Sequence, residues 1–225
     1  MTVANSTLSG NATEGSGGGI DVDGSVTVTN STISGNSAGE FGGGIFSGEN
    51  GILTVTRCNV SENAAGSWTG GIRSFGFAQI IDTTVSNNIA VNGRGGIANR
   101  PSGNMTITGV TVWENIIANA GAMTVTNTTV STDGVGISNR DPGSMSMVST
   151  TVSGVRNHGA MTVRNNIIDG GCELTAPLES FGGNIESPGN TCGFGHLTDQ
   201  VGVTPTELAL DSLEDNGGQA AAPQL

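Results

Sequence analysis

A single hydrophobic pattern recurs along most of the chain. An apolar anchor between polar neighbours occurs eight times, at spacings of 16 to 27 residues, and a second apolar residue follows each anchor five positions later. The anchors are Val3, Val28, Val55, Ile80, Ile107, Val125, Met147 and Val163. The second positions are Leu8, Ile33, Val60, Val85, Val112, Val130, Val152 and Ile168. Isolated apolar positions of this kind are typical of half-buried strands, and a fixed long period is typical of a solenoid.

A third element, Gly-Gly-Ile, follows in the first four copies and ends at Ile20, Ile45, Ile72 and Ile97; we expect degenerate versions at Gly136-Ile137 and residues 182–185. Three short strands per repeat predict an all-β chain, a single-stranded right-handed parallel β-helix of about eight coils. We expect residues 1–169 to form the coils and residues 170–225 an irregular C-terminal cap, in one continuous domain. The later coils are expected to keep two strands and to shorten the third side.

An asparagine recurs eight positions after each of the first five anchors. These residues are Asn11, Asn36, Asn63, Asn88 and Asn115, and Asp133 holds the next equivalent position. Stacked coils would place the asparagines in one column, where each side-chain amide can bond the next. The pattern therefore predicts a structural asparagine ladder.

Composition and charge argue against nucleic acid as a binding partner and against membrane insertion. Gly accounts for 38 of 225 residues, Tyr is absent, every basic residue other than the two histidines is an Arg, and the net charge is −12. Nucleic-acid binding depends on neutralising phosphates, so this charge argues against a nucleic-acid partner. No apolar run is long enough to cross a membrane, and no membrane insertion is expected.

The Gly-Gly-Gly-Ile and Ser-Gly-Asn repeats resemble those of polymorphic outer membrane proteins, which have the pectate-lyase-like shape. The C-terminal segment resembles the choice-of-anchor Q domain through residues 182–185, Cys192, residues 199–201 and residues 213–218. This resemblance implies a secreted or cell-surface bacterial or archaeal protein. It implies no catalytic residues, because the family has no settled activity.

Cys172 and Cys192 have the separation expected of a disulfide that closes a loop of about 20 residues, worth about 3 kcal/mol by chain-entropy reasoning. Such a bond would fit an exported protein. Cys58 occupies an inward position that other copies fill with Ser31, Val110 or Thr128, so it is expected to be a small buried residue.

Two groups of residues are candidates for ligand binding. Arg73, Arg100 and Arg140 follow strands of the Gly-Gly-Ile type, and Asn99 and Asn139 precede two of them. Guanidinium groups on one side of the rod could hold an acidic glycan by bidentate contacts. Asp21 and Asp23 could ligate calcium from one turn, although no neighbouring repeat reproduces the pair. No other cofactor is expected.

Threonines flank the anchors of several copies. Stacking would place them in two outward ranks: Thr27, Thr29, Thr54, Thr56, Thr106, Thr108, Thr124 and Thr126. Flat threonine arrays suit ice binding, but threonine also suits any exposed strand position.

The preferred hypothesis is therefore an extracellular, adhesin-like structural module that binds a polysaccharide or a surface protein on its flat faces. A polysaccharide lyase or hydrolase, active or lapsed, is the alternative, and an ice-binding protein is the third hypothesis. Catalytic residues cannot be identified from the sequence, and the pattern favours a non-enzymatic function. Self-association is expected at the N-terminal edge, where Val3 starts the pattern without a cap.

Overall fold

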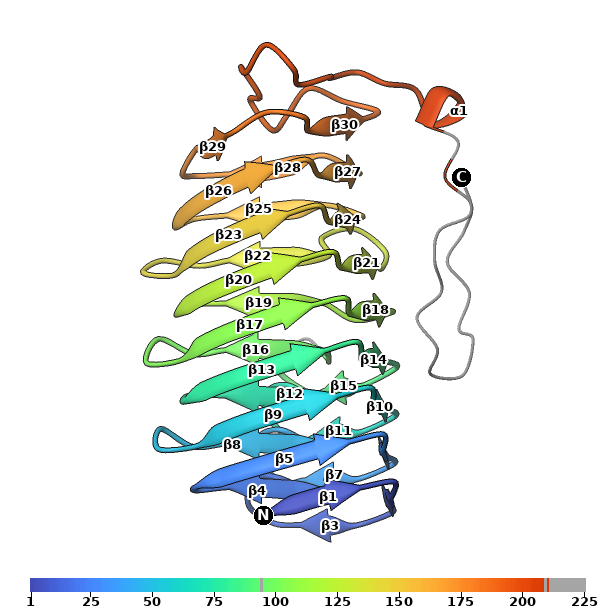
Figure 1. Ribbon diagram of the computed structural model, residues 1–225, viewed down its shortest axis with the longest axis vertical. Helices are drawn as coiled ribbons and strands as arrows, with labels where there is room; N and C mark the ends of the chain where they lie inside the picture. Colours follow the sequence, from blue (N-terminus) through green and yellow to red (C-terminus); the bar gives the residue numbers. More distant parts are fainter. Residues whose placement is uncertain (94, 209, 211–225) are drawn as a thin grey trace.

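The computed structural model describes residues 1–93, 95–208 and 210 and is a parallel β-helix. Short strands stack coil upon coil, and every strand pair is parallel (Figure 1). The predicted fold class is therefore confirmed. No helix among the described residues is long and apolar enough to span a membrane.

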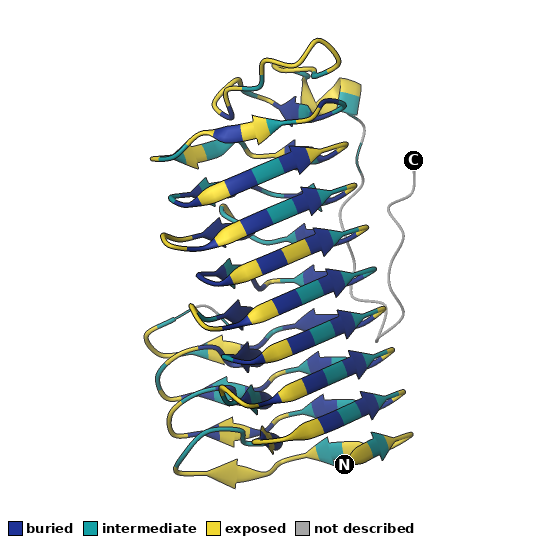
Figure 2. Cartoon of the chain, turned by 60° about the vertical axis from the view of Figure 1, so that its left-hand side comes forward, coloured by how far each residue is buried: buried dark blue, intermediate teal, exposed yellow. Residues whose placement is uncertain are grey.

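Sheet A contains the anchors, and its register joins all eight in one column. Its strands alternate between inward apolar and outward polar residues, which gives the repeated bands of burial in Figure 2. The strands are β1 (Thr2–Ala4), β5 (Ser25–Thr29), β9 (Ile52–Thr56), β13 (Phe77–Ile81), β17 (Asn104–Thr108), β20 (Ala122–Thr126), β23 (Ser144–Val148), β26 (Ala160–Arg164) and β29 (Leu178–Ser180).

Sheet B contains the second apolar position of each repeat, again in one column. A residue with positive φ, such as Asn30 or Asp82, bends the chain between sheets A and B. The strands are β2 (Thr7–Ser9), β6 (Thr32–Ser34), β10 (Asn59–Ser61), β14 (Thr84–Ser86), β18 (Thr111–Trp113), β21 (Thr129–Ser131), β24 (Thr151–Val152), β27 (Ile167–Asp169) and β30 (Ile185–Ser187).

Sheets C and D complete the coils. Among the described residues, sheet C is confined to the first four coils, as β3 (Ala12–Thr13), β7 (Ser37–Ala38), β11 (Ala64–Ala65) and β15 (Ile89–Ala90). Sheet D continues through eight coils, as β4 (Ile20–Val22), β8 (Ile45–Ser47), β12 (Ile72–Ser74), β16 (Ile97–Asn99), β19 (Ile117–Asn119), β22 (Ile137–Asn139), β25 (Val155–Asn157) and β28 (Cys172–Leu174). The early coils thus have four strands. The later ones keep three and lose sheet C, so the expectation that they retain only two strands was wrong.

The stacking of strands continues beyond Asp169, where the sequence repeat fades. β28 pairs with β25, β29 with β26 and β30 with β27. Ile185 lies in β30 and pairs with Ile167 in sheet B, so residues 182–185 are not the degenerate Gly-Gly-Ile strand that the sequence suggested. A short helix, α1 (Pro205–Leu208), follows. Residues 209 and 211–225, which include part of the expected cap and of the family resemblance, lie outside the described residues.

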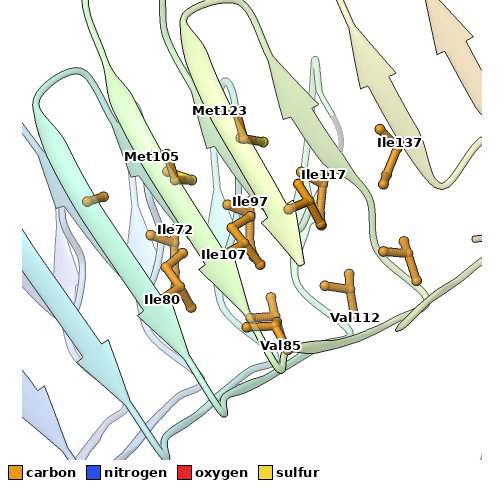
Figure 3. Close-up of a cluster of buried hydrophobic side chains, with 14 of the residues drawn as sticks. Ile72, Ile80, Val85, Ile97, Met105, Ile107, Val112, Ile117, Met123 and Ile137 are labelled. Atoms are coloured by element: carbon orange, nitrogen blue, oxygen red, sulfur yellow. The ribbon is translucent and has the colours of Figure 1, made fainter. Parts of the chain in front are cut away.

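The core is a continuous column of aliphatic side chains inside the coils. Val28, Val55 and Ile80 are fully buried in sheet A, as Ile33 and Val60 are in sheet B. Burying one such side chain contributes about 1.5–3 kcal/mol, and each coil needs its neighbours to achieve that burial. Figure 3 shows the middle of this column, where side chains of successive coils meet.

The predicted asparagine ladder is present. Asn36 Oδ1 accepts hydrogen bonds from the backbone N–H and Nδ2 of Asn11, at 3.0 and 2.9 Å. The same pair of bonds joins Asn36 to Asn63, Asn63 to Asn88 and Asn88 to Asn115. The ladder ends there, because Asp133 is exposed on the shorter sixth coil. The asparagines thus satisfy buried backbone groups where the chain turns from sheet B.

A disulfide between Cys172 and Cys192 joins β28 to the segment after β30, as predicted. Glu186 is the register partner of Ile168 in the next coil of sheet B, and its carboxylate is fully buried. It accepts hydrogen bonds from Thr191 Oγ1 at 2.8 Å and from the Cys192 N–H at 3.1 Å. The end of the rod is thus closed by a covalent bond and by a satisfied buried carboxylate. Cys58 is free and buried, as expected.

Candidate functional site

Asn99 and Asn139 have a structural role, because their buried amides join neighbouring coils, and their role in ligand binding stays a prediction. Both are buried at the ends of sheet D strands. Asn99 Nδ2 donates to Asn119 Oδ1, Asn119 Nδ2 to Asn139 Oδ1, and Asn139 Nδ2 to Asn157 Oδ1, each at 2.9 Å. Each of these amides also donates to a carbonyl in the next coil. They form a second ladder, in which the Oδ1 of Asn99, the first member, is buried without a hydrogen-bond partner.

Arg73 lies on the outer side of sheet D. It is the middle residue of β12, in register with Phe46 of β8 and Ala98 of β16, whereas its neighbour Ile72 points into the core. The Arg73 side chain is nevertheless buried, with a relative exposure of only 4%. An outward cation with so little exposure must be covered by its neighbours on the surface.

Aromatic rings supply part of that cover. The guanidinium carbon of Arg73 lies 4.2 Å from the ring centroid of Phe41 and 5.2 Å from that of Phe75. Phe46 joins the two rings, with centroids 6.3 Å from Phe41 and 5.9 Å from Phe75. Arg100 contacts the same Phe75 ring at 5.9 Å. We call Phe41, Phe46, Arg73, Phe75 and Arg100 the Arg–Phe cluster.

Within the part of the chain that the structure describes, neither guanidinium group of the cluster has an acidic partner. The ion pair found among the described residues joins Arg156 to Glu173, at 2.6 Å. The Nε atoms of Arg73 and Arg100 are both buried without a hydrogen-bond partner. Burial and the charge of Arg100 lower the pKa of Arg73 to about 10, and burial and the charge of Arg140 lower the pKa of Arg100. The three predicted arginines thus repel one another, although Arg140 makes none of the ring contacts.

The Asp21 and Asp23 pair is exposed at the start of the rod. Partial burial and the charge of Asp23 raise the pKa of Asp21. Calcium takes six to eight oxygen ligands. No group of three or more His, Cys, Asp or Glu side chains is placed to hold a metal ion in the part of the chain that the structure describes. Calcium binding at this pair stays a prediction.

The threonine ranks lie on the outer face of sheet A. Thr27, Thr54, Thr106 and Thr124 form one rank with Gln79 between them, and Thr29, Thr56, Thr108 and Thr126 form the other with Ile81 between them. Beyond β20, Ser146 and Val148 take the next positions. The arrays are therefore aligned but interrupted, and ice binding stays a prediction.

An open groove of about 810 Å³ runs along one border of sheet A. Its floor holds the small first residues of three strands, Ala122, Ser144 and Ala160, which are exposed and in register. One side carries the hydroxyl groups of Thr124, Ser146 and Thr162 and ends at Glu179; the other side carries Asp141, His158 and Pro177. The groove crosses the strands from β17 to β29, so it extends for roughly 19 Å at the usual strand spacing.

Sequence reasoning missed the phenylalanines and the groove. Phe46 and Arg73 both follow the Ile of a Gly-Gly-Ile element, and that common offset could have placed them side by side. Phe41, which forms an isolated bridge with Trp68, and Phe75 lie in connections between strands, whose path the repeat does not fix. The groove exists because the column that holds the large residues Ile52 and Phe77 in earlier coils holds the small residues Ala122, Ser144 and Ala160 in later ones.

Comparison of the chain with protein-family models, with curated proteins and with solved structures finds no match. The proposed resemblance to choice-of-anchor Q domains and to polymorphic outer membrane proteins therefore stays a prediction.

Proposed function

We propose that the protein is an extracellular, adhesin-like module that binds an extended glycan along sheet A without altering it. The groove over Ala122, Ser144 and Ala160 carries this proposal. It is open at the surface, follows the rod axis and presents hydroxyl, amide and carboxylate groups, which suit the hydroxyl groups of a polysaccharide. The disulfide supports an oxidising, extracytoplasmic location.

The test compares two tryptophan substitutions in one column of sheet A. Ser144→Trp would fill the groove, whereas Ser25→Trp adds the same ring at an exposed position outside it. Because the carboxylates of Asp141 and Glu179 line the groove, binding to a panel of immobilised neutral polysaccharides is measured for both variants and the unmodified chain. We expect Ser144→Trp to weaken binding about tenfold by steric exclusion and Ser25→Trp to leave it unchanged. Equal binding by the two variants would contradict the proposal.

Lyase or hydrolase activity is the competing function, because Asp141, His158 and Glu179 line the same groove. Carboxylic acids and imidazoles are the usual acids and bases of such reactions. Pectin, alginate and other uronic-acid polymers are incubated with the protein, with and without calcium. Release of unsaturated products, seen by ultraviolet absorbance, or of new reducing ends would show that the protein is an enzyme and would contradict a purely binding function.

A further inference from the structure

The Arg–Phe cluster on sheet D contains positive charge that no acidic side chain among the described residues pairs with. Arg73 is 4% exposed, yet its Nε lacks a partner and neither Arg73 nor Arg100 forms an ion pair within the described residues. Burying an unpaired cation is costly, and ring contacts recover only about 0.5–2 kcal/mol each. The chain carries a net charge of −12, so unpaired arginines are not explained by a lack of acidic residues.

We propose that the Arg–Phe cluster binds the carboxylate of an acidic sugar, as found in uronic-acid glycans. A carboxylate accepts two parallel hydrogen bonds from one guanidinium, which neither Lys nor a neutral amide can reproduce. Arg100, which is less buried than Arg73, makes the first contact with the carboxylate. Arg73 lies deeper and supplies a second positive charge across the Phe75 ring.

The aromatic rings favour a sugar over an acidic peptide. Phe41, Phe46 and Phe75 are each only partly buried. Their rings give a sugar ring an apolar surface beside the charge, whereas an aspartate or glutamate side chain would leave that surface uncovered. This site deepens the proposed glycan-binding function, but it stands on another sheet and on other residues, so either proposal can fail alone.

The experiment measures binding of oligogalacturonate to the full chain by isothermal titration calorimetry at low and high salt. Arg100→Gln removes the proposed first contact. Arg164→Gln removes one positive charge from an exposed position on sheet A and serves as the matched control. We expect a loss of about tenfold or more for Arg100→Gln and a change within about twofold for Arg164→Gln. Equal effects of the two substitutions, or no binding by the unmodified chain, would overturn the proposal.

Two further measurements fix the ligand class. Phe75→Leu keeps an apolar residue but removes the shared ring, and it is expected to weaken oligogalacturonate binding while circular dichroism stays unchanged. Polyglutamate tests for a general anion site, and binding as tight as that of oligogalacturonate would contradict a sugar-specific site. The groove variant Ser144→Trp should bind oligogalacturonate at the cluster as well as the unmodified chain does. Failure of the groove proposal is thus distinguishable from failure of this one.

Discussion

At the scale of single residues, the same residue type serves different purposes according to its column. Asparagines in two columns satisfy buried backbone groups, and Asn63 alone contacts Asn36, Ile33 and Asn88. The sequence predicted the first ladder because its spacing from the anchors is fixed. It did not predict the second ladder at Asn99 and Asn139, because an asparagine beside an arginine suggests a ligand site as readily as a turn. The burial of both amides favours the structural interpretation over a ligand site.

Replacing Asn63 by Ala should destabilise the protein by about 3 kcal/mol or more, because several buried polar groups lose a partner at about 1–3 kcal/mol each. The groups affected are the N–H and Nδ2 of Asn36 and the Ile33 carbonyl. Chemical denaturation measures the change. Asn11→Ala is the control, since Asn11 is exposed and Asn36 keeps its bond to the Asn11 backbone N–H; a similar loss for both variants would contradict the role of the ladder.

Cys58 should be inert to thiol reagents in the folded protein, because it is 2% exposed and burial raises the pKa of its thiol. Under denaturing, non-reducing conditions a single thiol should react; three would show that the disulfide is absent. Between the unfolded pKa of about 8.5 and the higher folded value, only the folded chain keeps its thiol proton. Stability should therefore fall as pH rises through that window, and Cys58→Ala should lack this part of the fall.

At the scale of elements, the anchor spacing predicts registers but not the number of sheets. The pairing of Val28 with Val55 and of Ile33 with Val60 follows directly from the repeat. Sheet C was not predicted, because its strands have two residues each and its inward positions are mostly small, as at Ala38 and Ala65. Strands β28 to β30 were hidden for another reason: their inward positions include Cys172 and Glu186, which do not match the aliphatic pattern.

The disulfide and the Glu186 contacts should stabilise the end of the rod locally. Replacing both Cys172 and Cys192 by Ser should cost about 3 kcal/mol, as expected for a loop of 20 residues. Amide hydrogen exchange should accelerate in β28, β29 and β30 and stay slow in the central coils, because a solenoid coil contacts only its neighbours. Cys58→Ser is the control for the loss of a cysteine. Faster exchange along the whole rod would show that the disulfide acts globally instead.

At the scale of the whole molecule, the structural features and the two candidate sites lie on different parts of the β-helix. The core and the two ladders lie inside, the groove lies on sheet A, and the Arg–Phe cluster lies on sheet D. The fold could be inferred from the sequence because every coil repeats it. Of the candidate sites, the sequence indicated only Arg73 and Arg100, because the phenylalanines and the groove depend on side chains from several coils that break the repeat. Stability should accordingly depend on how many neighbouring coils a residue has.

The same large-to-small substitution in adjacent coils tests this dependence. Ile33 and Leu8 are register partners in sheet B; Ile33 is fully buried between two coils, whereas Leu8 lies in the first coil and is partly exposed. Ile33→Ala removes contacts with both neighbours and should cost about 2–5 kcal/mol, as core deletions of this size do. Leu8→Ala should cost less than half as much, since Leu8 is partly exposed and, among the described residues, pairs in sheet B with Ile33 alone. Urea denaturation gives both values. Equal costs would show that the rod unfolds as a single unit whose first coil is as well packed as its middle, and nearest-neighbour stacking would then fail as an account of its stability.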